Sequence, residues 1–257
     1  MDLGISGRIA LVTGASRGIG RAAAGALARE GAHVVVAARG VPGVERAVEE
    51  LRAEGAVAEG IVVDMADPLG PAEAVARAEA LMGPVDILVA NAGGPPPGRF
   101  LDVGEEGWDL AVQQNLLGTV RLIRAALPGM RARGWGRIIT ITSTSVREVI
   151  DGLALSNATR AGVAGAVRTL AREVAADGVT VNNVLPGPIL TDRMRELLSG
   201  QPDLEAAIAK RGARNPTGRV GAPGEVGDLV AFLASERAGF INGASVMIDG
   251  GESRVVG

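Results

Sequence analysis

The segment Thr13-Gly14-Ala15-Ser16-Arg17-Gly18-Ile19-Gly20 joins an apolar run, residues 9–12, to an alanine-rich helical stretch, residues 21–30. Strand, glycine turn and helix therefore follow one another. The three glycines let the backbone turn sharply and let a bulky anion approach, because none of them carries a Cβ. The start of the helix adds unpaired N–H groups and the positive end of its dipole. The segment predicts a pyrophosphate-binding turn. Its spacing differs from the G-x-G-x-x-G fingerprint, so an ordinary tight turn is the alternative.

Strand and helix patterns alternate along the rest of the chain. Helical periodicity over residues 105–133 is too long for one globular helix, so a break is expected before Val112. The alternation predicts an α/β fold, a doubly wound, mostly parallel sheet with helices on both faces. Strands are expected at residues 9–12, 33–38, 58–64, 85–90, 136–142, 179–185 and 244–249, and other helices at 43–54, 71–82, 155–176 and 225–235.

No linker or repeat divides the sequence, so residues 1–257 are predicted to form a single dinucleotide-binding and catalytic domain. Residues 187–224 are punctuated by proline and glycine and hold one expected helical insert near residues 191–198. A segment of this length inside a compact domain is usually functional. We expect a substrate loop or lid there.

Composition excludes several classes of protein. The chain is 47% hydrophobic, yet no apolar run approaches the length of a membrane helix and the N-terminus lacks the layout of a signal peptide, so we expect a cytoplasmic protein that binds no membrane. A net charge of −3 without a basic block argues against nucleic acid as a partner. With no cysteine or tyrosine and with one histidine, His33, the chain lacks thiolate, phenol and histidine-triad chemistry, and no metal site is expected.

The ends of the predicted strands carry the candidate ligand-binding residues. A binder of unphosphorylated ribose places an acid at the end of the second strand, but Arg39 stands there. Together with Arg17 it offers guanidinium groups for a 2′-phosphate, which favours NADP over NAD. Asp64, after the third strand, is a candidate acceptor for an adenine amino group. The small residues Asn91-Ala92-Gly93 let the backbone lie against a ribose.

Six motifs of the chain, and their order along it, resemble those of the classical short-chain dehydrogenase/reductases, especially the 3-oxoacyl-carrier-protein reductase-like branch. They are residues 13–20, residues 91–93, Asn115, Ser143, Pro186-Gly187 and the ending 241–251. The resemblance implies a Rossmann fold of about seven strands, a nicotinamide cofactor and a homotetramer or homodimer. The cofactor contacts that this comparison and the strand ends indicate are Gly14, Ser16, Arg17, Gly18, Ile19, Gly20, Arg39, Asp64, Met65, Asn91, Ala92, Gly93, Arg160, Pro186, Gly187 and Ile189.

The chain departs from the family at its catalytic pair. Ser156 and Arg160 stand where the family has a tyrosine and, four residues later, a lysine. A serine hydroxyl is much less acidic than a phenol, and loss of a general acid typically costs about 10² to 10⁴ in rate. The predicted catalytic residues are Asn115, Ser143, Ser156 and Arg160. In this hypothesis Ser143 donates to the carbonyl oxygen, and a water held by Ser156 and Asn115 passes the proton.

Two functions are compatible with an intact cofactor-binding turn and a changed catalytic tyrosine position. The first is an NADP-dependent oxidoreductase that reduces a carbonyl or oxidises an alcohol, of 3-oxoacyl type, with a non-tyrosine proton donor. The alternative is a catalytically weak or inactive nucleotide-binding sensor or scaffold. Apolar residues after position 188 suggest a substrate wall with little charge, at which Arg193 or Arg195 meets an acidic group. Trp108 and Trp135 are assigned to packing or an interface.

Overall fold

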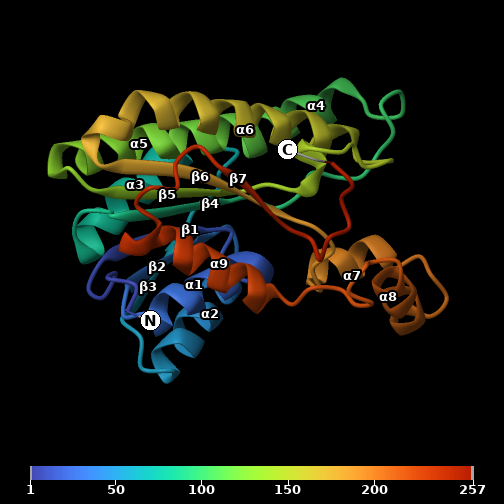
Figure 1. Ribbon diagram of the computed structural model, residues 1–257, viewed down its shortest axis with the longest axis horizontal. Helices are drawn as coiled ribbons and strands as arrows, with labels where there is room; N and C mark the ends of the chain where they lie inside the picture. The colour runs from blue at the N-terminus through green and yellow to red at the C-terminus, as the bar shows by residue number, and fades with distance from the viewer. Residues whose placement is uncertain (1, 256–257) are drawn as a thin grey trace.

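The computed structural model describes residues 2–255 and contains a seven-stranded sheet in which all neighbouring strands are parallel (Figure 1). The strand order is β3-β2-β1-β4-β5-β6-β7. The predicted doubly wound sheet is confirmed. The strands are β1 Ile9–Thr13, β2 His33–Ala38, β3 Ala58–Val62, β4 Ile87–Asn91, β5 Gly136–Ile141, β6 Val179–Pro186 and β7 Ser245–Ile248.

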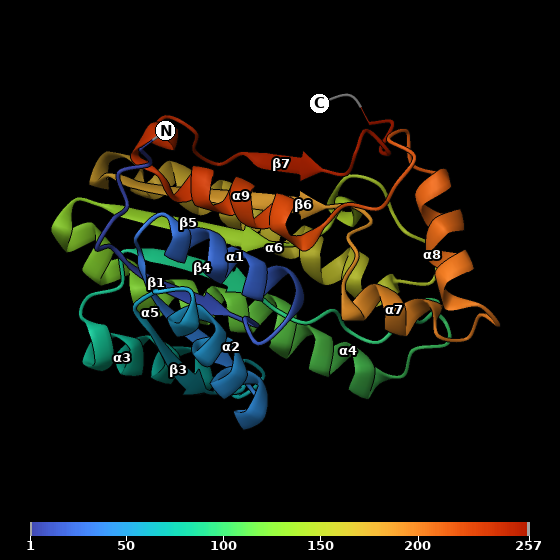
Figure 2. The ribbon, with the colours of Figure 1, turned by 90° about the horizontal axis from the view of Figure 1, so that it is seen from below.

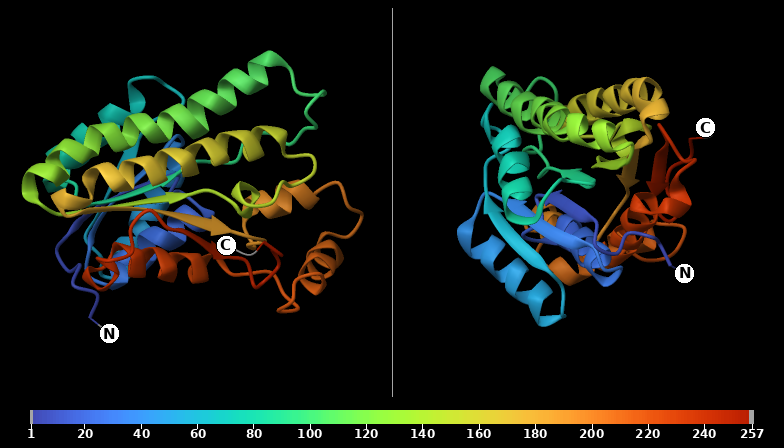
Figure 3. Two further views of the ribbon diagram at one scale, coloured as in Figure 1. Left: turned by 45° about the horizontal axis from the view of Figure 1, so that its top comes forward. Right: turned by 90° about the vertical axis from the view of Figure 1, so that its left-hand side faces the viewer.

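Helices cover both faces of this sheet (Figure 3). One apolar core lies between the sheet and helices α1 (Gly18–Arg29), α2 (Val41–Ala53) and α9 (Pro223–Ala234). A second core lies on the opposite face, against α3 (Gly70–Met82), α5 (Gly118–Arg133) and α6 (Ala154–Val174). Because both faces are covered, the central strands need apolar residues at successive positions. All five residues of β1 are buried accordingly.

The long helical stretch is interrupted where the sequence predicts. Helix α4 (Glu105–Ala111) continues into a π-helical segment, Val112–Leu117, before α5 begins at Gly118. The start of α5 lies beside the loop after β3, because a Cβ on Gly118 would be 2.5 Å from the carbonyl oxygen of Met65. The wide turn places Asn115 in the interior, 4% exposed.

The segment after β6 contains two helices, not the single insert predicted. Helix α7 (Asp192–Leu198) matches the prediction, but α8 (Leu204–Ala213) was not anticipated. Figure 2 shows both helices beyond the carboxyl ends of the strands. Only Ile208 and Gly212 of α8 are buried, so its apolar face is too short to stand out in the sequence.

The two tryptophans lie in different surroundings. Trp108 of α4 packs edge to face with Phe100, with 5.6 Å between ring centroids. Trp135 lies under the guanidinium groups of Arg8 and Arg137, 3.9 and 4.5 Å from its ring centroid. No helix within residues 2–255 has the length and apolar character needed to cross a membrane.

Helices α1 and α9 cross at Gly227, and this contact yields a stability prediction. A Cβ on Gly227 would lie 2.6 Å from the carbonyl oxygen of Ala22. We expect Gly227→Ala to force the helices apart and to cost about 1–3 kcal/mol, the usual range for overpacking. Thermal unfolding followed by circular dichroism measures the loss, at about 2–4 °C for each kcal/mol.

The matched control is Gly224→Ala in the same helix, where nothing lies within 4 Å of the added Cβ. That variant should be as stable as the parent or slightly more stable, because alanine favours a helix over glycine. Equal melting temperatures for the two variants would contradict the close crossing.

Candidate functional site

A cavity of about 1260 Å³ opens at the edge of the sheet where the parallel strands end. Loops that follow β1 to β6 contribute to its wall, and residues of α7 and α8 close it from the outside. Ligands of open parallel sheets bind at this edge, because every loop that leaves a strand meets there. The geometry makes this cavity the candidate site.

The glycine turn forms one end of the cavity. Gly14 and Gly18 both have φ of +59°, a left-handed conformation that favours glycine. A Cβ on Gly20 would overlap the carbonyl oxygen of Gly14, so Gly20 supports the turn from behind and does not line the cavity. No side-chain hydrogen bond caps the N-terminus of α1. Its first N–H groups are therefore open to an anion.

The turn is fastened to the neighbouring strand β4. Thr13 Oγ1 donates to the carbonyl oxygen of Asn91 at 2.9 Å and accepts from its N–H at 3.0 Å. The Asn91 side chain donates from Nδ2 to the Gly14 carbonyl oxygen at 3.2 Å. These bonds fix the turn relative to the loop that begins with Asn91-Ala92-Gly93.

The two arginines predicted at the nucleotide end differ in their partners. Arg17 is ion-paired with Asp192 at 3.5 Å and with Glu196 at 3.1 Å, both on α7. Arg39 lines the same cavity and is exposed, and no carboxylate of the described residues pairs with it. Arg39 is thus the guanidinium available to a ligand, whereas Arg17 is held by α7.

The other predicted cofactor residues are brought together as the sequence suggested. Asp64 lies at the cavity with its Oδ1 bound to the N–H of Ala66 at 2.9 Å, which leaves Oδ2 to accept. Gly187 lies close to Asp249, the residue that follows β7, because a Cβ on Gly187 would be 2.6 Å from Cβ of Asp249. The cavity wall includes Ser16, Gly18, Ile19, Met65, Asn91, Ala92, Gly93, Pro186, Gly187 and Ile189.

Ser143, Ser156 and Arg160 line the cavity beyond this loop. Ser143 Oγ accepts from the N–H of Ser145 at 3.1 Å, which leaves its O–H free to donate. Arg160 donates from Nε to Ser156 Oγ at 3.0 Å. It also donates from Nη1 to the carbonyl oxygens of Ile141 and Thr142, at 3.1 and 2.7 Å. Burial, and secondarily the charge of Arg193, lower the pKa of Arg160 to about 10.

Asn115 lies one layer behind the cavity wall and does not line it. Its Nδ2 donates to the carbonyl oxygen of Gly93 at 2.8 Å. Its buried Oδ1 has no hydrogen-bond partner among the described residues. Asn115 therefore supports the loop after β4, and its Oδ1 is an acceptor open to an ordered water.

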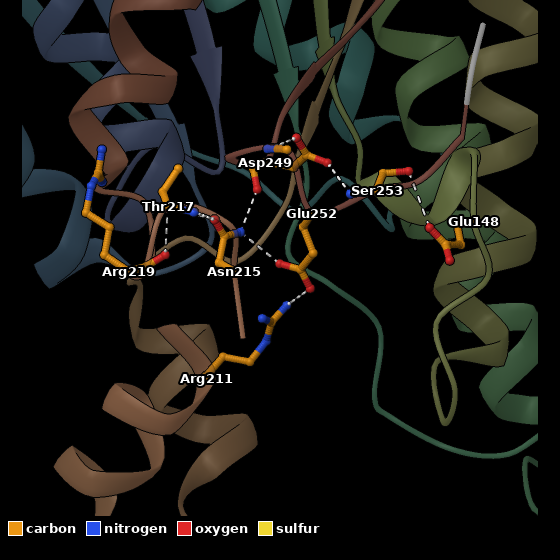
Figure 4. A network of polar contacts seen from close by, with 9 residues as sticks. Glu148, Arg211, Asn215, Thr217, Arg219, Asp249, Glu252 and Ser253 are labelled. Atoms are coloured by element: carbon orange, nitrogen blue, oxygen red, sulfur yellow. Dashed lines mark hydrogen bonds and ion pairs between the residues drawn. The ribbon is translucent and has the colours of Figure 1, made fainter. Parts of the chain in front are cut away.

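One part of the cavity wall was missed by sequence reasoning. The segment after β7 folds back to the cavity, where Glu252 pairs with Arg211 of α8 at 2.5 Å (Figure 4). Asn215 donates to the Asp249 carbonyl oxygen at 2.7 Å and to Glu252 at 3.0 Å. Ser253 Oγ donates to Glu148 at 3.3 Å. These partners are 34 to 105 residues apart, and no local pattern announces them.

Comparison with known families agrees with this geometry. The model of a family described as enoyl-(acyl carrier protein) reductase matches residues 14–253. Among curated proteins, the 3-oxoacyl-(acyl-carrier-protein) reductase FabG of Escherichia coli (strain K12) is 39% identical over 249 residues, which cover 97% of this chain and 98% of that protein.

Solved structures of the same fold are also similar. The L-sorbose reductase of Gluconobacter frateurii, complexed with NADPH and L-sorbose, superposes with a TM-score of 0.94 and is 35% identical, with both chains covered completely. An actinorhodin polyketide ketoreductase variant with NADPH gives a TM-score of 0.93 at 34% identity, over 97% of this chain and 98% of the other.

Proposed function

Because this chain belongs to the short-chain dehydrogenase/reductase family, we propose that it is an NADP-dependent oxidoreductase that reduces a carbonyl, or oxidises the matching alcohol. Its relatives are oxidoreductases, and NADPH is bound in similar solved structures. A 3-oxoacyl-type substrate agrees with the relatives. The finer part of the proposal is a proton donor that is not a tyrosine.

The observation that carries this function is the continuity of one cavity. The wall that contains Gly18 and Ile19 also contains Ser143, Ser156 and Arg160. A nucleotide whose phosphates lie at the start of α1 therefore has room to extend toward the two serines. Transfer between a nucleotide and a carbonyl needs this proximity.

The residues present fit NADP(H). The uncapped N-terminus of α1 suits the pyrophosphate, and the exposed Arg39 suits the 2′-phosphate. Asn91, Ala92 and Gly93 border the middle of the cavity, and Pro186 with Gly187 border its far part. When bound, the reduced nicotinamide supplies the hydride, and the carbonyl with one proton becomes the alcohol.

The chain's own residues then handle the oxygen and its proton. Ser143 donates its free O–H to the carbonyl oxygen as negative charge develops there. Ser156 accepts from the charged Arg160, so its own O–H is oriented to donate and is more acidic beside a cation. Ser156 passes a proton to the oxygen and takes one from water. The unpartnered Oδ1 of Asn115 is an acceptor for a water behind the loop.

A second candidate function is a nucleotide-binding sensor or scaffold with little turnover. One feature favours it: Arg160 uses Nε and Nη1 in bonds within the protein, to Ser156 and to two carbonyl oxygens. An arginine held in this way occupies the position of the family's lysine and supplies no proton to a substrate. Tight nucleotide binding without turnover would favour this candidate.

We also propose that the chain assembles as a homotetramer or homodimer. Strand β7 is an edge strand whose residues are only partly buried, and the neighbouring Phe240 is fully exposed. Apolar edges of this kind are usually covered by a partner.

Arg39 should set the preference for the phosphorylated nucleotide. We expect the protein to bind NADPH more tightly than NADH in a titration that follows nicotinamide fluorescence. Arg39→Gln should weaken NADPH binding by about 10- to 100-fold, because a charge-assisted contact to phosphate is lost. NADH binding should stay the same. If the variant weakened the binding of NADPH and NADH equally, Arg39 would not be a ligand of the 2′-phosphate.

Ser143 should be needed for turnover but not for nucleotide binding. With a panel of 3-oxoacyl thioesters, quinones and small ketones, Ser143→Ala should lower kcat by about 10²-fold or more, as does removal of an oxyanion donor elsewhere. Ser145→Ala is the control, since Ser145 is buried, lies outside the cavity wall and has a hydroxyl without a partner in residues 2–255.

Restoring the family's pair with Ser156→Tyr and Arg160→Lys together should raise kcat if proton transfer limits the rate.

The pH dependence should differ from that of a tyrosine enzyme. Within the described wall, the cavity has no tyrosine, lysine, histidine or cysteine, and the pKa of Arg160 is about 10. Arg160 therefore keeps its charge below that pH and loses it above. At saturating NADPH we expect kcat to be flat between about pH 6 and about pH 9 and to fall toward higher pH. A titration step near pH 7 or 8 would contradict Ser156 and Arg160 as the donor pair.

A further inference from the structure

Two guanidinium groups meet at Gly94, on the side of the cavity next to the serines. A methyl group added to Gly94 would lie 3.5 Å from Nε of Arg193 and 3.9 Å from Nη2 of Arg160. Arg193 comes from α7, and Arg160 comes from α6. Because Gly94 has no side chain, the space between the two groups is open to the cavity.

Neither of these cations is neutralised within hydrogen-bond distance. Arg160 bonds only to Ser156 and to two carbonyl oxygens, all of them uncharged, and its Nη2 has no acceptor in the described part of the chain. Arg193 donates from Nη2 to the Pro95 carbonyl oxygen at 2.7 Å. Its nearest carboxylate, on Glu196, is 3.8 Å away and is closer to Arg17.

Three acids on the cavity wall, Glu252, Glu148 and Asp192, are held by other partners. Glu252 pairs with Arg211, and Glu148 accepts from Ser253 (Figure 4). Asp192 pairs with Arg17. Two like charges that face each other across an open gap raise one another's energy, and after burial the charge of Arg193 is the second cause that lowers the pKa of Arg160. An anion in the gap would relieve the repulsion and could accept from both groups.

The nucleotide does not provide that anion. Its pyrophosphate belongs at the start of α1 and its 2′-phosphate at Arg39, both at the other end of the cavity. The end near Ser143 and Ser156 is where the reacting carbonyl belongs. An anion at Gly94 must therefore come from the substrate, and the flat, two-oxygen shape of a carboxylate matches guanidinium donors.

We propose, resting on the reductase function above, that the substrate is an oxo acid whose carboxylate binds between Arg193 and Arg160 at Gly94. Arg193 is the specificity residue, and it reaches the cavity because Pro95 holds its guanidinium there. Arg195, also on α7, is excluded from this role, since it pairs with Glu205 at 2.7 Å and does not line the cavity.

The test compares acids with their uncharged methyl esters. Calorimetry on the protein saturated with NADP⁺, in which no ketone is reduced, would use unbranched 2-, 3- and 4-oxo acids and the ester of each. We expect one of the acids to bind at least about tenfold more tightly than its ester. Arg193→Gln should remove that preference, with a loss of about 10- to 100-fold for the acid and little change for the ester. Arg193→Lys should keep part of the preference.

Arg195→Gln is the matched control, since it removes the same charge from the same helix outside the cavity, and its acid and ester affinities should equal those of the parent. The proposal is overturned if no acid binds more tightly than its ester, or if Arg193→Gln weakens both alike. Turnover of the same acids and esters with NADPH is measured separately. Reduction of an ester without acid preference would keep the reductase function and reject the oxo acid. No turnover of any compound would reject the reductase function, while calorimetry still decides whether a carboxylate binds at Arg193.

Discussion

The contact between the glycine turn and strand β4 is the constraint on which the site depends. Thr13 and Asn91 exchange two hydrogen bonds, and the Asn91 amide reaches the Gly14 carbonyl oxygen. Gly20 must lack a Cβ for the turn to close over that oxygen. This packing sets the direction of α1 and hence the place of its uncapped N-terminus. It also fixes the start of the loop that carries Gly93 and Gly94, so the start of α1 and the loop after β4 are positioned by one set of contacts.

The outer wall of the cavity is held in place by ion pairs and by hydrogen bonds from arginine and asparagine side chains. Arg17 ties the glycine turn to α7 through two carboxylates, and Arg193 ties α7 to the loop after β4. On the other side, Asn215 and Glu252 join the segment after β7 to the end of α8. Exposed ion pairs contribute little stability individually, because water and salt screen them. Their effect here is on the position of side chains, since they decide which arginines face the cavity.

Ser156 and Arg160, the catalytic pair proposed above, have a consistent physical environment. A partly buried arginine is costly without hydrogen bonds, and Arg160 satisfies Nε and Nη1 with Ser156 and two carbonyl oxygens at the end of β5. The remaining nitrogen faces the cavity beside Arg193. In the catalytic pair proposed above, a hydroxyl and a guanidinium thus stand where the family has a phenol and a lysine, and the guanidinium keeps the positive charge of the lysine.

The sequence by itself determined the layers, the parallel sheet and the glycine turn, because these follow from local periodicity and backbone freedom. It also located the break at Val112 and most of the cavity wall, including Ser143, Ser156 and Arg160, since strand ends in a parallel sheet gather at one edge. Only the tertiary structure decided that Arg17 is held by α7 while Arg39 is available, that Asn115 lies behind the wall, and that Arg193 but not Arg195 faces the cavity. These outcomes depend on pairings between distant residues and on the rotation of α7 about its axis, which no local pattern encodes.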